Sequence, residues 1–229
     1  MANFLKNSNL FRAGTLALVA GFGTSGCFWN DEPSPSPGGF SGTGQSAYYG
    51  GQDSFIVVDW NYGKILAEQN ADKKRPVAGL AQVATAMVVL DWIGANSISK
   101  GSLIAIPNTA PQFGQANPLG LQPGDRISVR DAVSSMILAR DPVAAEALAL
   151  HFGWQMSRQA GGRNGMLVFV EQMNALAERL DMNRTKFENA HGLSVMGRPG
   201  YSTARDMAKL ANYAIKNPRF NFHAAQSSR

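Results

Sequence analysis

Residues 70–93 read NADKKRPVAGLAQVATAMVVLDWI, and the second half of this stretch forms the centre of the expected fold. Val83–Ile93 is apolar almost all round and contains the helix formers Ala and Met. The segment is too long for a typical buried strand, and a helix that is apolar on every side is buried on every side. We therefore predict a helix that runs through the middle of the domain.

A β-hairpin is predicted before this helix. Phe55–Val58 and Lys64–Glu68 are short apolar runs, and the turn residues of Asp59–Gly63 lie between them. After the helix, Gly101–Val129 is punctuated by proline and glycine and contains an evident turn at Leu121–Asp125. We expect this second segment to be a long connection on the surface.

Helical patterns follow from residue 130 onward. We expect helices over Arg130–Leu138, Val143–Phe152 and Met166–Leu180, with Pro142 interrupting the first two. The third helix should bury one face, made of Leu167, Val170, Met173, Leu176 and Leu180. A hairpin followed by a helical cluster predicts an α+β fold.

A capping pair predicts where the last helix begins. Thr203 followed by Asp206 is a capping box, so a helix should start there and run through Ile215. Asn217-Pro218 should end it. No internal repeat is visible in the 229 residues.

The N-terminus carries a predicted signal peptide over residues 1–26. This stretch contains Lys6 and Arg12, no acidic residue, and the apolar run Ala13–Phe22. Ten residues are too few to span a bilayer core, but they match the apolar region of a secretory signal. Small residues then lead into Cys27, the single cysteine of the chain.

The segment around Cys27 resembles a bacterial lipoprotein signal, in which this cysteine is acylated and becomes the new N-terminus. Thr24 stands where that class usually has an aliphatic residue, so an ordinary cleaved signal is the alternative. Residues 27–53 are rich in Pro, Gly and Ser and should form a flexible tether. We expect an exported protein on the periplasmic side of a membrane. Phe28 is not aspartate, which favours the outer membrane in a Gram-negative host.

Composition argues against several function classes. The net charge is +5, but the basic residues are scattered, and Lys73, Lys74 and Arg75 form the one tight cluster. No basic stripe is interleaved with aromatic residues, so we expect no nucleic-acid partner. With three histidines and one cysteine, the sequence shows no metal-ligand constellation, and we expect no cofactor.

Four blocks of sequence resemble one enzyme family. They are residues 70–93, LQPGDRISVRDAVSSMILARDPVAAEALA at 121–149, FVEQMNALAERLDMNRTKFENAHGLS at 169–194 and YSTARDMAKLANYAI at 201–215. In this order and spacing they are similar to the penicillin-binding D-alanyl-D-alanine carboxypeptidases, which are serine peptidases of the β-lactamase and transpeptidase fold. The resemblance implies that residues 54–229 form one such domain.

That family's reaction implies three motifs. A serine at the start of the buried helix attacks the acyl carbon, and a lysine three residues later accepts its proton. The resemblance places Gly79 at the nucleophile position and Gln82 at the base position. The second motif, Ser-x-Asn, falls on Arg140 to Pro142, and the third, Lys-Thr-Gly, is expected beyond Arg229.

These replacements predict a protein that does not catalyse the family's reaction. Glycine has no side chain that can attack, and the amide of Gln82 does not accept a proton near neutral pH. We therefore expect an envelope lipoprotein with a binding or scaffolding role at peptidoglycan or in an assembly. The alternatives are an active serine-type carboxypeptidase that uses unconventional residues, and a decayed remnant.

Other residues could take over the roles of the missing nucleophile and base. Ser97-Ile98-Ser99-Lys100 fits Ser-x-x-Lys, but it follows the buried helix in a turn region. Ser134 and Ser135 are predicted to be ordinary helix residues, since no lysine or histidine is near them in sequence. His191 is expected to be structural.

Arg140 is open to two interpretations. As a new cation beside the former cleft it would bind a carboxylate, such as the terminus of a stem peptide. The alternative, which we favour, is that Arg140 pairs with Asp141 or points into water.

The resemblance also implies that strands completing the central sheet would follow the last helix. Without them the hairpin of residues 55–68 should carry an exposed edge. Either a partner protein supplies the missing layer, or the product is marginally stable. The expected partners are thus a membrane through the acyl anchor, and peptidoglycan or a protein that completes the sheet.

Overall fold

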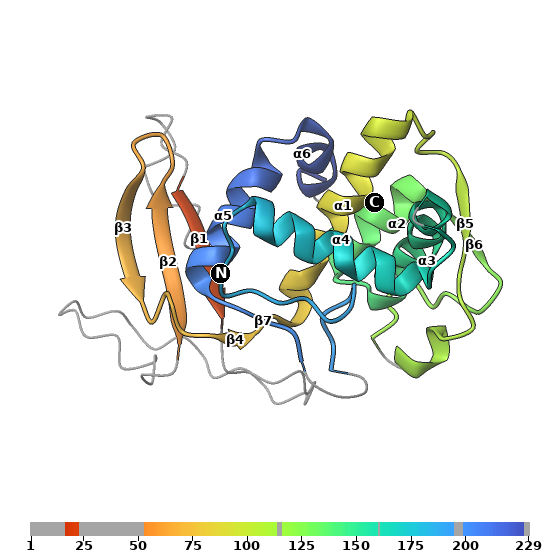
Figure 1. Cartoon of the computed structure of the whole chain (residues 1–229), viewed down its shortest axis with the longest axis horizontal. Coiled ribbons are helices and arrows are strands. Elements are labelled where there is room, and N and C mark those ends of the chain that lie inside the picture. Colours follow the sequence, from red (N-terminus) through yellow and green to blue (C-terminus); the bar gives the residue numbers. More distant parts are fainter. Residues whose placement is uncertain (1–16, 23–52, 114–115, 160, 195–198, 227–229) are drawn as a thin grey trace, which may run out of the picture.

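A three-stranded antiparallel sheet lies at one end of the molecule, and helices with two short strand pairs form the remainder of the described structure (Figure 1). The computed structural model describes residues 17–22, 53–113, 116–159, 161–194 and 199–226. Strands β2 (Ser54–Asp59) and β3 (Lys64–Gln69) form the predicted hairpin, with a shift of register between Val57 and Val58. Ile56 and Val58 of β2 point into the core, so alternate side chains of this strand are buried.

The predicted central helix is confirmed as α1 (Ala81–Asn96), which follows the short 3-10 turn η2 (Ala78–Leu80). Most of its side chains are buried, because helices pack on several of its sides. The stretch Ala78–Asn96 is long and apolar enough to cross a membrane. Its burial among neighbouring helices instead marks it as the core helix of the domain.

Five further helices surround α1 in Figure 1, and α2 to α6 each contact it. They are α2 (Val129–Ala139), α3 (Pro142–Gln159), α4 (Gly165–Arg179), α5 (Ala204–Ile215) and α6 (Pro218–Ala224). The first four were predicted, although α3 runs on to Gln159 past its expected end at Phe152. The α+β prediction is confirmed.

Two glycines let α3 and α4 approach each other closely. A Cβ atom added to Gly153 would lie 2.2 Å from the carbonyl oxygen of Gly165. A Cβ atom on Gly165 would lie 2.8 Å from the backbone nitrogen of Trp154. Both distances are shorter than van der Waals contact, so this crossing requires the two backbones to touch.

The predicted buried face of α4 was wrong in part. Leu167 is 60% exposed, whereas Met173 and Leu176 are buried as expected. The buried face is centred on Phe169. This large side chain is fully buried and lies where α4 crosses α3. Apolar residues occupy most sides of α4, so periodicity left its orientation uncertain by one or two residues.

Two pairs of short strands were not predicted. Strands β5 (Leu103–Ala105) and β6 (Arg126–Ser128) pair with each other, one from each half of the predicted surface connection. Backbone hydrogen bonds near residue 124 continue this pairing. Strands β4 (Arg75–Pro76) and β7 (Tyr201–Ser202) pair over a much longer separation in sequence. Two- and three-residue strands contain too few positions for any alternation to be recognised.

The predicted N-cap of α5 is confirmed, but the reciprocal half of the capping box is not formed. The Thr203 hydroxyl accepts a hydrogen bond of 3.1 Å from the backbone N–H of Asp206, whereas the Asp206 carboxylate accepts from residues 184 and 185. Asn217 follows the end of α5 as expected, but its side chain also caps a new helix by accepting from the N–H of Arg219. The end of α5 was therefore predicted correctly, whereas the start of α6 was not predicted.

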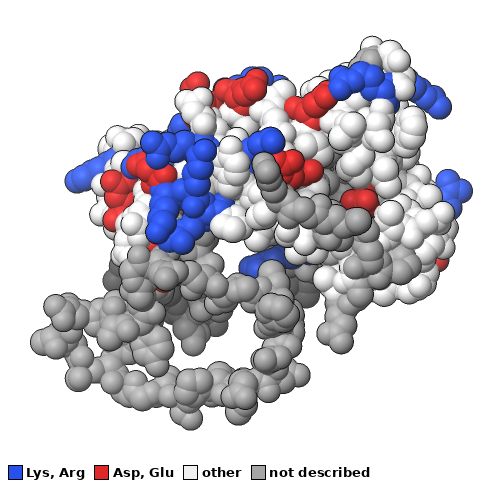
Figure 2. All heavy atoms as spheres, turned by 60° about the horizontal axis from the view of Figure 1, so that its bottom comes forward, with Lys and Arg blue, Asp and Glu red and all other residues white. Residues whose placement is uncertain are grey.

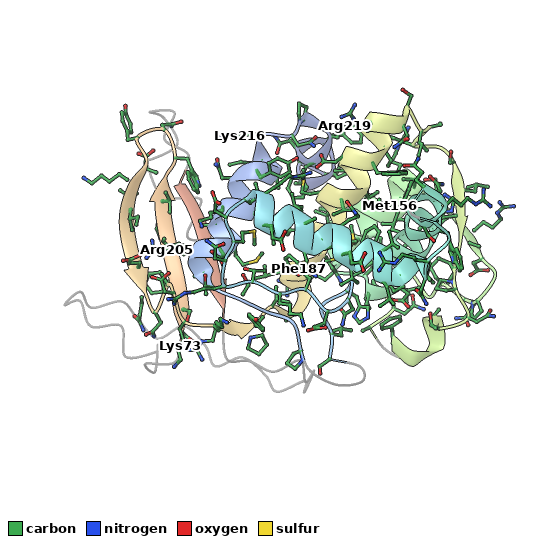
Figure 3. All side chains as sticks on the ribbon, viewed as in Figure 1. Lys73, Met156, Phe187, Arg205, Lys216 and Arg219 are labelled. Carbon is green, nitrogen blue, oxygen red and sulfur yellow. The ribbon has the colours of Figure 1, made fainter. Side chains whose placement is uncertain are left out.

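An ion-pair network ties the hairpin region to α5. The Arg205 guanidinium contacts Glu68 at 2.8 Å and Asp72 at 3.0 Å, and it projects toward the sheet in Figure 3. The hydrogen bond from Arg205 lowers the pKa of the Asp72 carboxyl. Figure 2 shows basic side chains gathered on this face next to acidic ones, with mostly uncharged surface beside them.

The edge of β2 that faces away from β3 is covered. Strand β1 (Ala17–Phe22) pairs with it antiparallel along its whole length. The expectation of an exposed hairpin edge was therefore wrong for β2, although in the described part of the chain β3 pairs on one side only. β1 lies within the predicted signal peptide; the remainder of that segment and the tether lie outside the described residues.

Candidate functional site

The turn that enters α1 lies against the end of α2. Gly79 belongs to η2, and a Cβ atom added to it would have Arg140 Cδ, at 3.8 Å, as its nearest neighbour. That is an ordinary contact distance, so glycine is not required here by crowding. The structure thus brings together Gly79 and Arg140, which the sequence predicted to share a site.

Gln82 connects three segments at this place. It sits in the first turn of α1 and is 4% exposed. Its Nε2 atom donates to the backbone carbonyl of Arg140 at 3.2 Å and to that of His191 at 3.4 Å. Its Oε1 atom is buried without a hydrogen-bond partner among the described residues. Gln82 therefore holds loops in place and leaves one acceptor unused.

Arg140 ends α2 in a left-handed conformation, with φ of 56°. Its side chain is exposed, and it forms no ion pair within the described part of the chain. The predicted pairing with Asp141 was wrong, because Asp141 points inward. The other half of that prediction, a solvent-facing side chain, is confirmed.

Asp141 and Pro142 start α3. The Asp141 carboxylate accepts from the N–H groups of Val143 at 2.9 Å and Ala144 at 3.1 Å, and from the Ser135 hydroxyl at 2.7 Å. Pro142 occupies the first position of the helix, where its missing N–H costs nothing. These residues have become a helix start, so Ser135 is an ordinary structural side chain as predicted.

His191 and Glu146 form a buried pair behind Gln82 that sequence alone did not reveal. His191 Nδ1 accepts from the N–H of Leu193 at 3.0 Å, and Nε2 lies 3.8 Å from a Glu146 carboxylate oxygen. Burial lowers the pKa of His191 to about 4 and raises that of Glu146, against a hydrogen bond from Thr109. Burial thus shifts both groups toward their neutral forms, and the position of His191 agrees with a structural role.

The residues that could replace the missing nucleophile and base do not lie together at this site. Ser97 caps the far end of α1 in a left-handed conformation, and the ammonium of Lys100 lies 5.7 Å from the ring of Phe222. Ser134 Oγ lies 2.9 Å from Nδ1 of His223, a histidine supplied by the unpredicted α6. Ser134 and His223 are 7% and 1% exposed, so this pair is closed to a substrate.

Two further predictions concern other kinds of site. Cys27, the predicted lipid attachment point, lies outside the described residues. Within the described ranges no group of three or more His, Cys, Asp or Glu side chains is arranged to hold a metal ion. The chemistry at Gly79, Gln82 and Arg140 therefore rests on hydrogen bonding and one exposed cation.

The fold is that of the penicillin-binding proteins, since penicillin-binding protein 6B from Escherichia coli is similar, with a TM-score of 0.60 and 32% identity over 73% of this chain and 51% of that one. The chain matches the D-alanyl-D-alanine carboxypeptidase family over residues 46–228 and belongs to it. The crystal structure of the D-alanyl-D-alanine carboxypeptidase DacD from Francisella tularensis is similar, with a TM-score of 0.65 and 30% identity over 75% of this chain. The carboxypeptidase from Mycobacterium tuberculosis has a TM-score of 0.62 at 27% identity.

Relatives in sequence agree with the structural neighbours. D-alanyl-D-alanine carboxypeptidase DacA of Escherichia coli is 32% identical over 170 residues, which are 72% of this chain and 39% of the enzyme. A D-alanyl-D-alanine endopeptidase of Pseudomonas aeruginosa is 34% identical over 157 residues, 69% of this chain and 45% of the enzyme. The chain thus spans less than half the length of these two relatives, and 38% and 60% of the two solved carboxypeptidase structures.

Proposed function

We propose that this chain is a non-catalytic member of the carboxypeptidase family that binds peptidoglycan, or an assembly on it, in the bacterial envelope. The proposal takes its location and ligand from the relatives, whose names state an action on D-alanyl-D-alanine. It takes its loss of catalysis from residues of this chain. The two parts rest on separate observations.

The observation that carries the proposal is Gly79 beside Gln82 at the entrance to α1. Covalent acyl transfer needs a nucleophile and a base within hydrogen-bond reach of each other. Gly79 offers neither group, and Gln82 spends its amide N–H on two backbone carbonyls. Loss of a nucleophile and base together removes several orders of magnitude of rate.

The surroundings support binding rather than a relocated reaction. The Arg140 side chain is exposed, and its Cδ atom lies 3.8 Å from the place that a Cβ atom at position 79 would occupy. A guanidinium binds carboxylates through two parallel hydrogen bonds. The terminal carboxylate of a stem peptide is therefore the group that this site is best suited to bind.

Export and anchoring are part of the same proposal. A leader removed before Cys27 and an acyl chain on that cysteine would hold the domain at the periplasmic side of a membrane. A single acyl chain gives marginal binding, so a second chain or a second contact is needed for stable anchoring. Peptidoglycan would supply such a contact for a protein on the outer membrane.

A sacculus assay tests binding and catalysis together. The full-length chain is incubated with purified sacculi, and both pelleted protein and released D-alanine are measured. We expect pelleting without release of D-alanine above the sacculi alone. Arg140→Ala should weaken pelleting several-fold, whereas Arg158→Ala, which changes an exposed arginine near the end of α3, should not.

Two results would contradict the proposal. Release of D-alanine that penicillin inhibits would show an active enzyme. Absence of both pelleting and release, for protein that melts cooperatively, would refute the binding role.

A further inference from the structure

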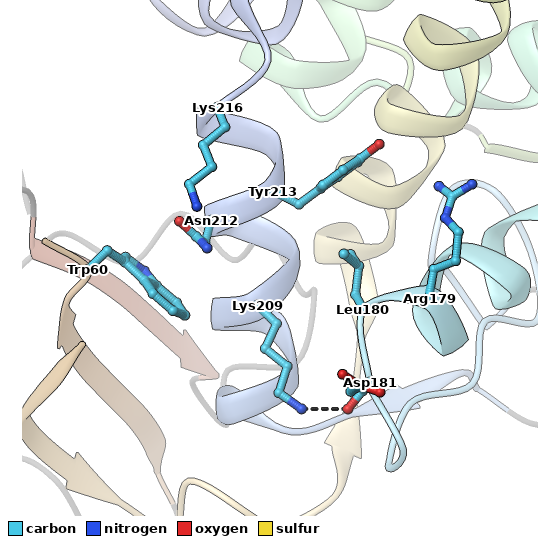
Figure 4. Close-up of a pocket in the computed structure, with 8 residues that line it drawn as sticks. All are labelled: Trp60, Arg179, Leu180, Asp181, Lys209, Asn212, Tyr213 and Lys216. Atoms are coloured by element: carbon cyan, nitrogen blue, oxygen red, sulfur yellow. Dashed lines mark hydrogen bonds between the residues drawn. The ribbon is translucent and has the colours of Figure 1, made fainter. Parts of the chain in front are cut away.

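A second candidate site lies between the sheet and the helices and shares no residue with the Gly79 site (Figure 4). It is a cavity of about 400 Å³ between the turn after β2, the end of α4 and the outer side of α5. This volume lies within the range of small-ligand pockets, roughly 300–1,000 Å³. Trp60, Leu180 and Tyr213 give it apolar walls.

Cations dominate the charge around the cavity. Arg179, Lys209 and Lys216 line it, against the single carboxylate of Asp181. Lys209 is already engaged, because its ammonium donates to the backbone carbonyl of Asp181 and lies 3.6 Å from Asp206. The other two basic side chains are therefore the ones available to a ligand.

Arg179 and Lys216 are weakly committed. Arg179 is 65% exposed and has one long contact, 3.8 Å, to Asp91. Lys216 is exposed and forms no ion pair within the described residues. Basic residues at helix C-termini commonly do no more than complement the helix dipole. Their charge alone would therefore not define a site.

Two unpaired polar atoms provide the independent sign of a ligand. The indole N–H of Trp60 and the amide oxygen of Asn212 are each buried with no hydrogen-bond partner among the described residues. An unsatisfied buried group costs about 1–3 kcal/mol, and native proteins contain few of them. One is a donor that lacks an acceptor, and the other is an acceptor that lacks a donor.

The flexible Lys216 side chain lies beside one of these two groups, the Asn212 amide. In Figure 4 it points along α5 toward Asn212, with the indole of Trp60 on the other side of the amide. A lysine stem on an exposed helix end changes rotamer at little cost. Its movement would open the Asn212 amide to the cavity while keeping the ammonium at the rim.

We propose that this cavity binds a small acidic sugar, carrying a carboxylate or a phosphate. The anion would contact Arg179 and Lys216, and a ring hydroxyl would accept from Trp60 and donate to Asn212. A hydroxyl satisfies both unpaired atoms at once, which a bare anion cannot do. The aromatic walls offer flat apolar surface to the carbon face of the ring.

The indole N–H signal of Trp60 gives a direct readout by NMR. The full-length chain contains four tryptophans, and Trp60→Phe identifies the signal by its disappearance. We expect D-glucuronate and glucose 6-phosphate to shift this signal in a saturable way, and D-glucose to bind about tenfold more weakly. The difference reflects the lost charge-assisted contact.

Matched variants separate the site from general charge. Lys216→Gln should weaken D-glucuronate binding about tenfold. Lys73→Gln, which changes an exposed lysine at the opposite side of the molecule in Figure 3, should leave it unchanged. Both positions are exposed, so both variants should fold.

Three outcomes would overturn the inference. They are equal affinity for D-glucose and D-glucuronate, a full shift of the Trp60 signal with inorganic phosphate alone, and no shift with any of the probes. Because none of the lining residues belongs to the Gly79 site, failure here leaves the proposed function untouched.

Discussion

At the scale of single residues, the former catalytic position is neither crowded nor strained. Gly79 has room for a side chain, since its nearest neighbour would be Arg140 Cδ at 3.8 Å, and its backbone is not left-handed. The fold therefore leaves room for a nucleophilic side chain at position 79, and glycine does not supply one. This distinction leads to the first prediction.

Gly79→Ser should leave the free energy of unfolding within about 1 kcal/mol of the original protein, because a serine fits the available space. It should not restore acylation, because Gln82 remains unable to accept the proton. Urea denaturation measures the first part and intact mass after incubation with a β-lactam the second. A loss above about 2 kcal/mol would show hidden crowding.

His191 makes stability depend on pH. Its pKa is about 4 in the folded protein against 6.5 when free, because burial opposes the charged form. Between these values the unfolded chain binds a proton that the folded one does not, so stability falls as pH falls. The 2.5-unit difference corresponds to about 3 kcal/mol lost between pH 6.5 and pH 4.

His191→Asn should remove most of this loss. An asparagine oxygen can still accept from Leu193, but the side chain does not titrate. Glu146 opposes the effect in part, because its raised pKa lets the folded state take up a proton as pH falls. Denaturant midpoints measured from pH 7 to pH 4 check this; equally steep curves for the two proteins would contradict it.

Residue types predicted the site better than they predicted contacts. The resemblance placed Gly79, Gln82 and Arg140 in one site, and in the structure the three residues are neighbours. It did not foresee that Asp141 would turn inward to cap α3, since a carboxylate next to an arginine suggests an ion pair. Nor did it reveal Glu146 beside His191, because these residues lie 45 positions apart on separate elements.

At the scale of elements, the backbones of α3 and α4 approach each other closely where the two helices cross. Gly153→Ala would place a Cβ atom 2.2 Å from the carbonyl oxygen of Gly165 and force the helices apart. We expect a loss of about 3 kcal/mol or a lower melting temperature of several degrees. Gly101→Ala is the control, because its Cβ atom would meet only Ser99 Oγ at 3.6 Å. Equal stability of the two variants would refute the close packing.

Strand β1 presents a different element-level test. It pairs with β2 in the full chain, yet it lies in the segment predicted to be a cleaved leader. A chain that starts at Cys27 would leave one edge of β2 unpaired. We expect the β2 amides that face β1 to exchange with solvent at least tenfold faster in that form, as measured by hydrogen exchange. Unchanged protection would show that β1 does not stabilise the sheet.

Long elements with a clear pattern were predictable, and short paired ones were not. α1 could be recognised from its eleven apolar residues, and α5 from its N-cap. β4 and β7 contain two residues each and pair across more than a hundred positions. Only the packing of the whole domain brings such segments together, so local sequence carries little sign of them.

At the scale of the whole molecule, the chain belongs to an enzyme family and spans 39% of the Escherichia coli relative. Its core is nonetheless continuous from the sheet through all six helices. The fold class could be predicted from the sequence because apolar periodicity and block order agree with each other. The cavity lined by Trp60 and Lys216 could not, because three separate elements form it.

If this chain is inactive, as proposed from Gly79 and Gln82, none of its nucleophiles should form an acyl-enzyme. Intact-protein mass spectrometry after incubation of the full-length chain with a β-lactam tests it most directly, with cooperative melting as the check on folding. We predict no increase in mass beyond the unmodified protein. A stoichiometric adduct, mapped by peptide analysis to one residue, would contradict the claim and identify the nucleophile.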